Sequence, residues 1–159
     1  GGTIRRNPRG REIGVAEDIR LTAEGVAHPM YAGKPAAFSA FAVHQDDTER
    51  LPEGAVVLAG NAMSPVHAIA YERGGARFWG VQYHPEFDAA AMAVTYRRLA
   101  KVLVQEGIVA AESEAESAAT RYDAAAAGRP EGALAASELA DPAMRTRELA
   151  NWLAAFITP

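Results

Sequence analysis

Cysteine is missing from all 159 residues of the sequence. Its absence excludes disulfides, zinc-thiolate sites and any thiol nucleophile supplied by these residues. Long apolar runs are missing too: no segment approaches the ~20 apolar residues that a membrane-spanning helix needs, and the first residues lack the charged-then-apolar order of a signal peptide. We therefore expect a cytoplasmic protein without a membrane partner.

The sequence also has fewer basic than acidic residues. Lysine and arginine number 16 against 20 acidic residues, which gives a formal net charge of -4 and an isoelectric point near 5.6. Proteins that bind nucleic acid draw much of their affinity from basic side chains on phosphates, so a nucleic-acid partner is not expected. The arginines between Arg5 and Arg11 are interpreted as a solvated face.

The sequence opens at Gly1-Gly2 without a methionine, and we expect the natural chain to begin further upstream. The composition, 49% hydrophobic and 23% charged, is close to the globular average. The length suits one core of ordinary size with an appendage.

The first part of the sequence predicts a hairpin. The extended runs Thr3–Arg6 and Glu12–Leu21 flank the turn tetrad Asn7-Pro8-Arg9-Gly10. Val26–Phe41 shows neither helical nor strand periodicity around its two prolines, so we predict a loop with one short helix there.

Three apolar runs between residues 55 and 87 predict an antiparallel meander. Gly74-Gly75 suits the tight turn before the third run, because glycine adopts positive φ without strain. The third run is apolar at most positions, which is typical of a strand covered on both faces and indicates a layered α/β domain. The predicted strands are Ala55–Ala59, Val66–Tyr71 and Arg77–Tyr83.

The sequence after residue 87 shows helical patterns. Asp88 is the predicted N-cap of a helix that ends at Gly107. Residues 109–140, rich in alanine and glutamate, predict short exposed helices broken at 128–130. A last helix begins at Asp141-Pro142, and its apolar stripe is expected to dock on its own domain, with a homodimer interface as the second interpretation. The stripe consists of Leu149, Trp152, Leu153 and Phe156.

His84 and Glu86 are the candidate catalytic residues. They follow the third apolar strand, at the carboxyl end, where open α/β sheets place their ligands. Side chains two apart in an extended chain share a face, with ~6–7 Å between Cα atoms, and Pro85 disfavours helical backbone at His84. The carboxylate can therefore hold one imidazole nitrogen while the other acts as a base toward a third group.

The eight residues Gly80-Val81-Gln82-Tyr83-His84-Pro85-Glu86-Phe87 resemble the strand-and-turn signature of class I, triad-type glutamine amidotransferases. The amidotransferase half of GMP synthase and its free-standing relatives are the most similar members. Arg11–Gly14 resembles the family segment that follows the nucleophile helix, and His44-Gln45-Asp46 resembles its His-x-Asp segment. The resemblance covers about residues 1–106.

The resemblance implies a three-layer, open-sheet α/β fold, with residues 1–107 as its C-terminal half and 108–159 as a helical extension. In the family a nucleophilic cysteine precedes a Gly-Gly pair such as Gly1-Gly2, so a Gly-x-Cys-x-Gly segment is expected upstream. His84 and Glu86 would then complete a Cys-His-Glu triad that hydrolyses glutamine or another γ-glutamyl compound. Ammonia would pass to water or to an accepting partner, no cofactor is implied, and the chain as given should be inactive alone.

Other interpretations compete with this one. Zinc deaminases also carry His-x-Glu, but they need a Pro-Cys-x-x-Cys run that is absent here. A metal site from His28, His44, Asp46 and His67 is conceivable, yet scattered histidines are more often surface or core residues, so no metal site is predicted. His44 is instead the candidate for substrate contact, and His67 is expected to pack within a strand. The non-enzymatic alternative is a pseudo-amidotransferase that keeps this part of the fold for binding or assembly.

Overall fold

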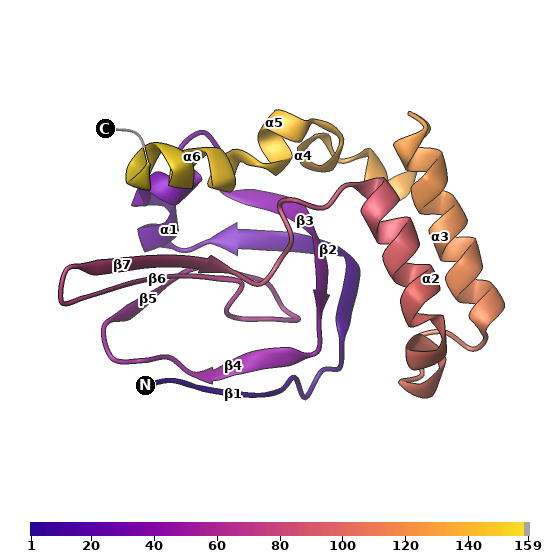
Figure 1. Cartoon of the computed structure of the whole chain (residues 1–159), viewed down its shortest axis with the longest axis horizontal. Helices are drawn as coiled ribbons and strands as arrows, with labels where there is room; N and C mark the ends of the chain where they lie inside the picture. Colours follow the sequence, from indigo (N-terminus) through magenta and orange to yellow (C-terminus); the bar gives the residue numbers. More distant parts are fainter. Residues whose placement is uncertain (158–159) are drawn as a thin grey trace.

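The computed structural model describes residues 1–157 (Figure 1). Its architecture is mixed α/β, the class that the sequence predicts. The strands are β1 (Thr3–Arg6), β2 (Glu12–Leu21), β3 (Ala37–His44), β4 (Asp46–Arg50), β5 (Ala55–Gly60), β6 (Ala68–Arg73) and β7 (Ala76–Val81). The helices are α1 (Ala23–Ala27), α2 (Ala89–Gln105), α3 (Glu112–Ala126), α4 (Ser137–Ala140), α5 (Pro142–Arg145) and α6 (Arg147–Phe156), with 3-10 turns η1 (Pro29–Tyr31) and η2 (Gly132–Ala135).

The main sheet has five antiparallel strands in the order β3-β2-β5-β6-β7, and it curls on itself (Figure 1). Strand β2 forms the corner, because it pairs with β3 along its length and with β5 only at its last two residues. The register shifts between Ala16 and Ile19, where Asp18 has a φ of 53°. A bulge of this kind bends a strand and increases its twist. Beyond β7, Tyr83 bridges to Ala42 of β3, so the chain returns to the other edge of the sheet.

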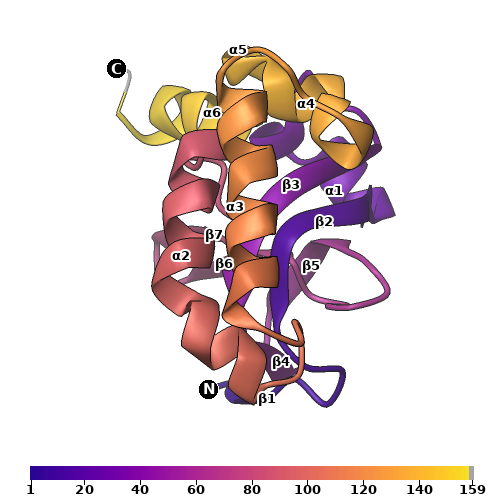
Figure 2. The same ribbon diagram turned by 90° about the vertical axis from the view of Figure 1, so that its right-hand side faces the viewer.

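Two apolar clusters lie on opposite faces of β3, because successive side chains of a strand alternate in direction. Phe38 and Ala40 contribute to the inner cluster, which includes Tyr83 and the side chains of η1. Phe41 contributes to the outer cluster, where α2 and α3 lie side by side (Figure 2). Met92 of α2 is fully buried there. The curled sheet is thus packed on both faces at β3.

The predicted hairpin between the first two strands is wrong, although both strands have the predicted bounds. Strand β1 pairs with β4 in a separate two-stranded ladder. Asn7 forms the expected turn, since its carbonyl accepts from the Gly10 N–H at 3.0 Å, but its own N–H donates to the Gln45 carbonyl at 2.8 Å. Turn residues set where the chain bends and leave the choice of strand partner to the tertiary structure. The predicted loop Val26–Phe41 is also partly wrong, because β3 begins within it.

The expectation that the third meander strand is covered on both faces is wrong as well. Strands β5, β6 and β7 form the predicted antiparallel meander, but β7 is the edge of the sheet and Phe78 is 55% exposed. Trp79 and Val81 pack against the inner cluster, and Phe156 covers Trp79 with 5.0 Å between ring centroids. An apolar composition on both faces therefore does not distinguish this edge strand from a buried one.

The helix predicted after the sheet is confirmed as α2, with Asp88 accepting from the Ala91 N–H at 2.8 Å and Gly107 at a φ of 70°. The next segment has the predicted break at 128–130, but its first part differs from the prediction of short exposed helices. Helix α3 has 15 residues and packs along α2, because small residues such as Ala115 and Ala119 are buried between them.

The last helical segment begins as predicted, with Asp141 capping α5, but it breaks at Thr146 before α6. The apolar stripe docks only in part, since Phe156 packs on the sheet while Leu149 and Trp152 are 41% and 38% exposed. Within residues 1–157, no helix combines the length and the apolar character needed to cross a membrane.

Candidate active site

His84 and Glu86 lie together just beyond β7, as their spacing predicts. His84 Nδ1 is 2.7 Å from Glu86 Oε1. The backbone holds the histidine from behind, because its N–H donates to the Phe41 carbonyl of β3 at 2.7 Å. The two side chains are 30% and 54% exposed, so solvent and a substrate can reach them.

The contact with Glu86 determines how the imidazole of His84 can react. With Nδ1 as the donor to the carboxylate, Nε2 carries a lone pair. The Phe87 ring stacks on the imidazole at a centroid distance of 4.3 Å and an interplanar angle of 20°, which restricts its rotation. Such an imidazole can take a proton from a nucleophile and later deliver it to a leaving group.

The residue before His84 anchors this site in the core. Tyr83 is 2% exposed, and its hydroxyl donates to Glu148 Oε1 at 2.6 Å and lies 2.9 Å from the Tyr31 hydroxyl. Burial raises the pKa of Tyr83, and Tyr31 and Glu148 raise it further, so the hydroxyl remains a donor. Lys34 Nζ lies 2.8 Å from the same Glu148 oxygen. Sequence reasoning missed this network because its members are far apart along the chain.

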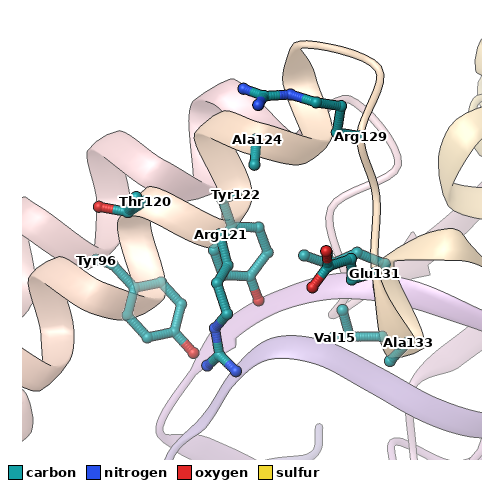
Figure 3. A pocket seen from close by; sticks show the side chains of 11 residues that line it. Val15, Tyr96, Thr120, Arg121, Tyr122, Ala124, Arg129, Glu131 and Ala133 are labelled. Carbon is teal, nitrogen blue, oxygen red and sulfur yellow. The ribbon is translucent and has the colours of Figure 1, made fainter.

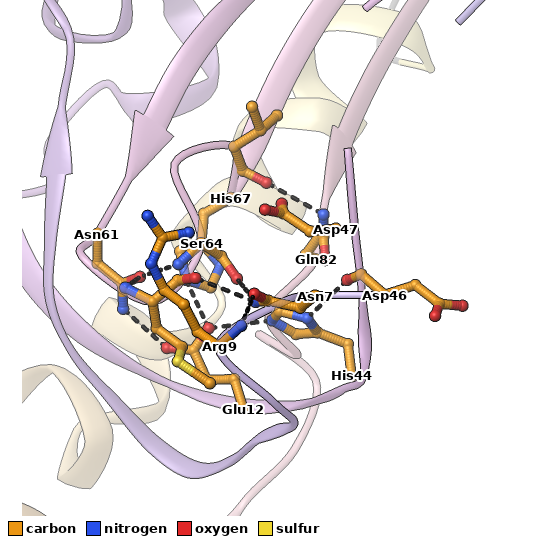
Figure 4. A network of polar contacts seen from close by, with 12 residues as sticks. Asn7, Arg9, Glu12, His44, Asp46, Asp47, Asn61, Ser64, His67 and Gln82 are labelled. Carbon is orange, nitrogen blue, oxygen red and sulfur yellow. Dashed lines mark hydrogen bonds and ion pairs between the residues drawn. The ribbon is translucent and has the colours of Figure 1, made fainter. Parts of the chain in front are cut away.

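His44 lies in a different polar cluster, the Glu12 cluster, formed by Glu12, His44 and His67 (Figure 4). The Nε2 atoms of His44 and His67 are 3.2 Å and 3.1 Å from Glu12 Oε2. Within residues 1–157, the polar and ring contacts of His44 are with Asp46 and with this cluster, and none joins it to His84. The substrate contact of His44 stays a prediction.

Sequence reasoning overlooked Glu12. It is 8% exposed, because it shares the inward face of β2 with Ala16. Burial raises the pKa of its carboxyl, but the contacts with His44 and His67 and a 2.8 Å hydrogen bond from Asn61 lower it by more, so the net shift is downward. The sequence did contain a signal for Glu12: it is in phase along the strand with Ala16, which faces the core, and a charged residue at such a position is expected to have buried partners.

A cavity of about 390 Å³ lies between α2, α3 and β2 (Figure 3). The hydroxyls of Tyr96 and Tyr122 and the guanidinium of Arg121 point toward β2. Both hydroxyls lie 2.8 Å from where a Cβ on Gly14 would be, and the φ of Gly14 is 102°, so any larger residue would be strained at that point. Neither His84 nor Glu86 lines this cavity, which is therefore distinct from the His84 site.

Comparison with known proteins identifies the family of this chain. Residues 1–101 match the family model of class I glutamine amidotransferases. The chain belongs to this family. A γ-glutamyl-L-1-hydroxyisopropylamide hydrolase from Pseudomonas is 35% identical over a 153-residue alignment that covers 93% of this chain and 52% of the hydrolase. One subunit of a glutamine-hydrolysing GMP synthase from Methanocaldococcus jannaschii is 33% identical over 81 residues, 48% of this chain and 42% of its own length.

Among solved structures, a glutamine amidotransferase from Thermotoga maritima superposes with a TM-score of 0.56 at 21% identity, over 81% of this chain and 51% of that one. This likeness shows the fold. The chain spans about half the length of these three proteins. The family and the fold class that the sequence predicts are both confirmed.

Proposed function

We propose that His84 and Glu86 are the acid–base part of a Cys-His-Glu triad that hydrolyses the side-chain amide of glutamine or of another γ-glutamyl compound. The 2.7 Å contact between His84 Nδ1 and Glu86 Oε1 carries this proposal. Membership of the class I glutamine amidotransferase family supports it, as does the likeness to a γ-glutamyl amide hydrolase.

The reaction needs a thiolate, and the sequence contains no cysteine, so the nucleophile comes from outside these 159 residues. His84 Nε2 takes the thiol proton as sulfur attacks the amide carbon. When the tetrahedral intermediate collapses, the carbon–nitrogen bond breaks and Nε2 returns the proton to the departing amine. Water then attacks the γ-glutamyl thioester, with His84 again taking a proton, and glutamate and the thiol are released. The Glu86 carboxylate stabilises the imidazolium in both steps.

A second protein that receives the ammonia belongs to the same proposal. The archaeal relative is named as one subunit of a synthase, which supports such an arrangement. The absence of cysteine favours a second candidate function, that of a pseudo-amidotransferase that binds or assembles without chemistry. Under both candidate functions, the 159-residue chain alone should release no ammonia from glutamine.

A chimera distinguishes the two functions. This chain replaces the matching 153 residues of the Pseudomonas hydrolase, and steady-state release of amine from the hydrolase's own substrate and from glutamine is measured. We expect turnover in the chimera. His84→Asn should lower kcat by about 10²–10⁴-fold with little change in KM, because it removes proton transfer and spares binding. Glu86→Gln should cost less, since Glu86 orients and stabilises the ring.

Gln82→Asn is the control, because the Gln82 side chain donates to the Val66 carbonyl at 3.1 Å and, within residues 1–157, has no hydrogen bond to His84 or Glu86. It should keep most of the turnover. Near-normal turnover in His84→Asn would refute the catalytic assignment. A folded chimera without activity, checked by circular dichroism, would favour the non-enzymatic function.

A further inference from the structure

The Glu12 cluster brings three electron-rich atoms together in the protein interior. One ligand atom from each of Glu12, His44 and His67 lies within 4.8 Å of the other two. His67 is fully buried, and the side chains of His44 and Glu12 are 12% and 8% exposed. Within residues 1–157, Glu12 Oε2, both Nε2 atoms and His67 Nδ1 are buried without a well-formed hydrogen bond.

Neighbouring groups fix the orientation of the ligand atoms. His44 Nδ1 lies 3.2 Å from the Asp46 carbonyl, which can only accept, so Nδ1 carries the proton and Nε2 presents a lone pair. Asn61 Oδ1 accepts from the Met63 and Ser64 N–H groups at 3.0 Å and 2.7 Å. The amide nitrogen of Asn61 therefore faces Glu12 Oε1, and Oε2 is left for the cluster.

A lone pair on His44 Nε2 thus faces a carboxylate oxygen 3.2 Å away. Two such atoms repel unless a cation lies between them. The oxygen could accept an N–H from each ring, but for His44 this would require protons on both nitrogens, because its Nδ1 already donates to the Asp46 carbonyl. A metal ion with several coordination positions satisfies all three atoms together.

The backbone around these residues is well ordered by the sheet. Glu12 and His44 are cross-strand partners in the β2–β3 ladder. The His67 N–H donates to the Ala59 carbonyl and its carbonyl accepts from the Gln82 N–H, both at 2.8 Å. Metal-binding histidines characteristically hold their second nitrogen on a backbone carbonyl or a carboxylate, as His44 does here.

We propose that Glu12 Oε2 and the Nε2 atoms of His44 and His67 bind one divalent transition-metal ion. Two imidazoles and a carboxylate, without a thiolate, are a ligand set that suits Zn²⁺. Ligand atoms arranged tetrahedrally around zinc with bonds of ~2.0–2.1 Å lie about 3.3 Å apart. The distances of 3.1 Å and 3.2 Å from the two Nε2 atoms to Glu12 Oε2 are close to this value, and all three ligand atoms lie within 4.8 Å of one another. The fourth position is open to water, and the ion joins β2, β3 and the turn before β6.

The test uses the 159-residue chain after removal of metal with a chelator. Zn²⁺ is titrated by calorimetry at pH 7.5, and Co²⁺ is used to read the coordination geometry from its visible spectrum. We expect one ion per chain, a tetrahedral Co²⁺ spectrum and a higher melting temperature with Zn²⁺. Glu12→Gln and His44→Ala should each weaken Zn²⁺ binding at least about tenfold, given that even outer-shell changes cost 10–100-fold.

Asp46→Asn is the matched control for Glu12→Gln, because it also removes one negative charge close to His44. The contact of Asp46 with His44 is made by the backbone carbonyl, so this substitution leaves that contact in place. His28→Ala removes an imidazole that packs on Trp79 outside the cluster. Both should bind Zn²⁺ like the unmodified chain. His44→Ala keeps the test valid if changes at buried Glu12 disturb folding, which circular dichroism without metal reports.

Three results would overturn the proposal. The first is the absence of saturable Zn²⁺ or Co²⁺ binding. The second is undiminished binding in folded Glu12→Gln and His44→Ala. The third is a set of ¹⁵N NMR chemical shifts showing that both ring nitrogens of His44 carry a proton and that Zn²⁺ does not change this. In that case a proton, and not a metal ion, would hold the cluster together.

Discussion

Replacing Glu148 by alanine tests how α6 is held on the sheet. The side chains of Lys34 and Glu148 are each 2% exposed, with Nζ 2.8 Å from Oε1. Without the carboxylate, the Lys34 ammonium keeps only the Met144 carbonyl at 3.0 Å among its hydrogen-bond partners in residues 1–157. Removing one partner of a buried ion pair costs about 3–5 kcal/mol. For a chain of this size each kcal/mol corresponds to about 2–4 °C, so we expect the melting temperature to fall by about 6–20 °C.

A double variant separates charge from packing. Lys34→Met with Glu148→Leu removes both charges and should cost only about 0–2 kcal/mol, because well-packed apolar residues often replace a buried ion pair without loss. Glu53→Ala, a change at an exposed glutamate, is the control and should stay within about 0.5 kcal/mol of the unmodified chain. Urea unfolding followed by circular dichroism measures all variants. A cost below about 1 kcal/mol for Glu148→Ala would refute the reasoning, as would a double variant that costs the sum of its single changes.

Two further changes test local contacts. The Arg11 side chain donates to Glu106 at 2.7 Å and lowers the pKa of that carboxyl. The stability from this contact is fully present above the unfolded pKa of about 4.3 and is lost as the pH falls through the folded pKa. Glu106→Gln should therefore lower the urea midpoint at pH 7 and lower it much less at pH 3. An equal decrease of the midpoint at both pH values would contradict this. Gly25→Ala would place a Cβ 1.9 Å from the Leu58 carbonyl oxygen and should cost at least about 2 kcal/mol, so an unchanged midpoint would show that the backbone yields easily.

Local signals predicted the elements that local interactions decide. Asp88 and Gly107 define the ends of α2 because capping and positive φ are properties of a few consecutive residues. Gly74 and Gly75 likewise produce the predicted β6–β7 hairpin. The first hairpin failed because the turn at Asn7 is real but β1 finds its partner in β4, a choice set by contacts distant in sequence.

In the candidate site, too, contacts between neighbouring residues could be predicted and contacts between distant residues could not. The contact between His84 and Glu86 follows from their i, i+2 spacing beside a proline, and it could be predicted. The Glu12 cluster could not, because it depends on the β2–β3 register and on the curl that brings His67 across the sheet. Sequence reasoning considered His44 and His67 as ligands but omitted Glu12, whose inward position only the strand pairing defines.

The ion pair between Lys34 and Glu148 also has a consequence for protein synthesis. A ribosome adds the glutamate 148 − 34 = 114 residues after the lysine. At about 5–20 residues per second, this interval is about 6–23 s. During that time the Lys34 ammonium stays hydrated, because its dry position beside Tyr83 offers no counter-charge before α6 is made. The ion pair that holds α6 on the rest of the fold can therefore form only late in translation, after the strands of the inner cluster have been made.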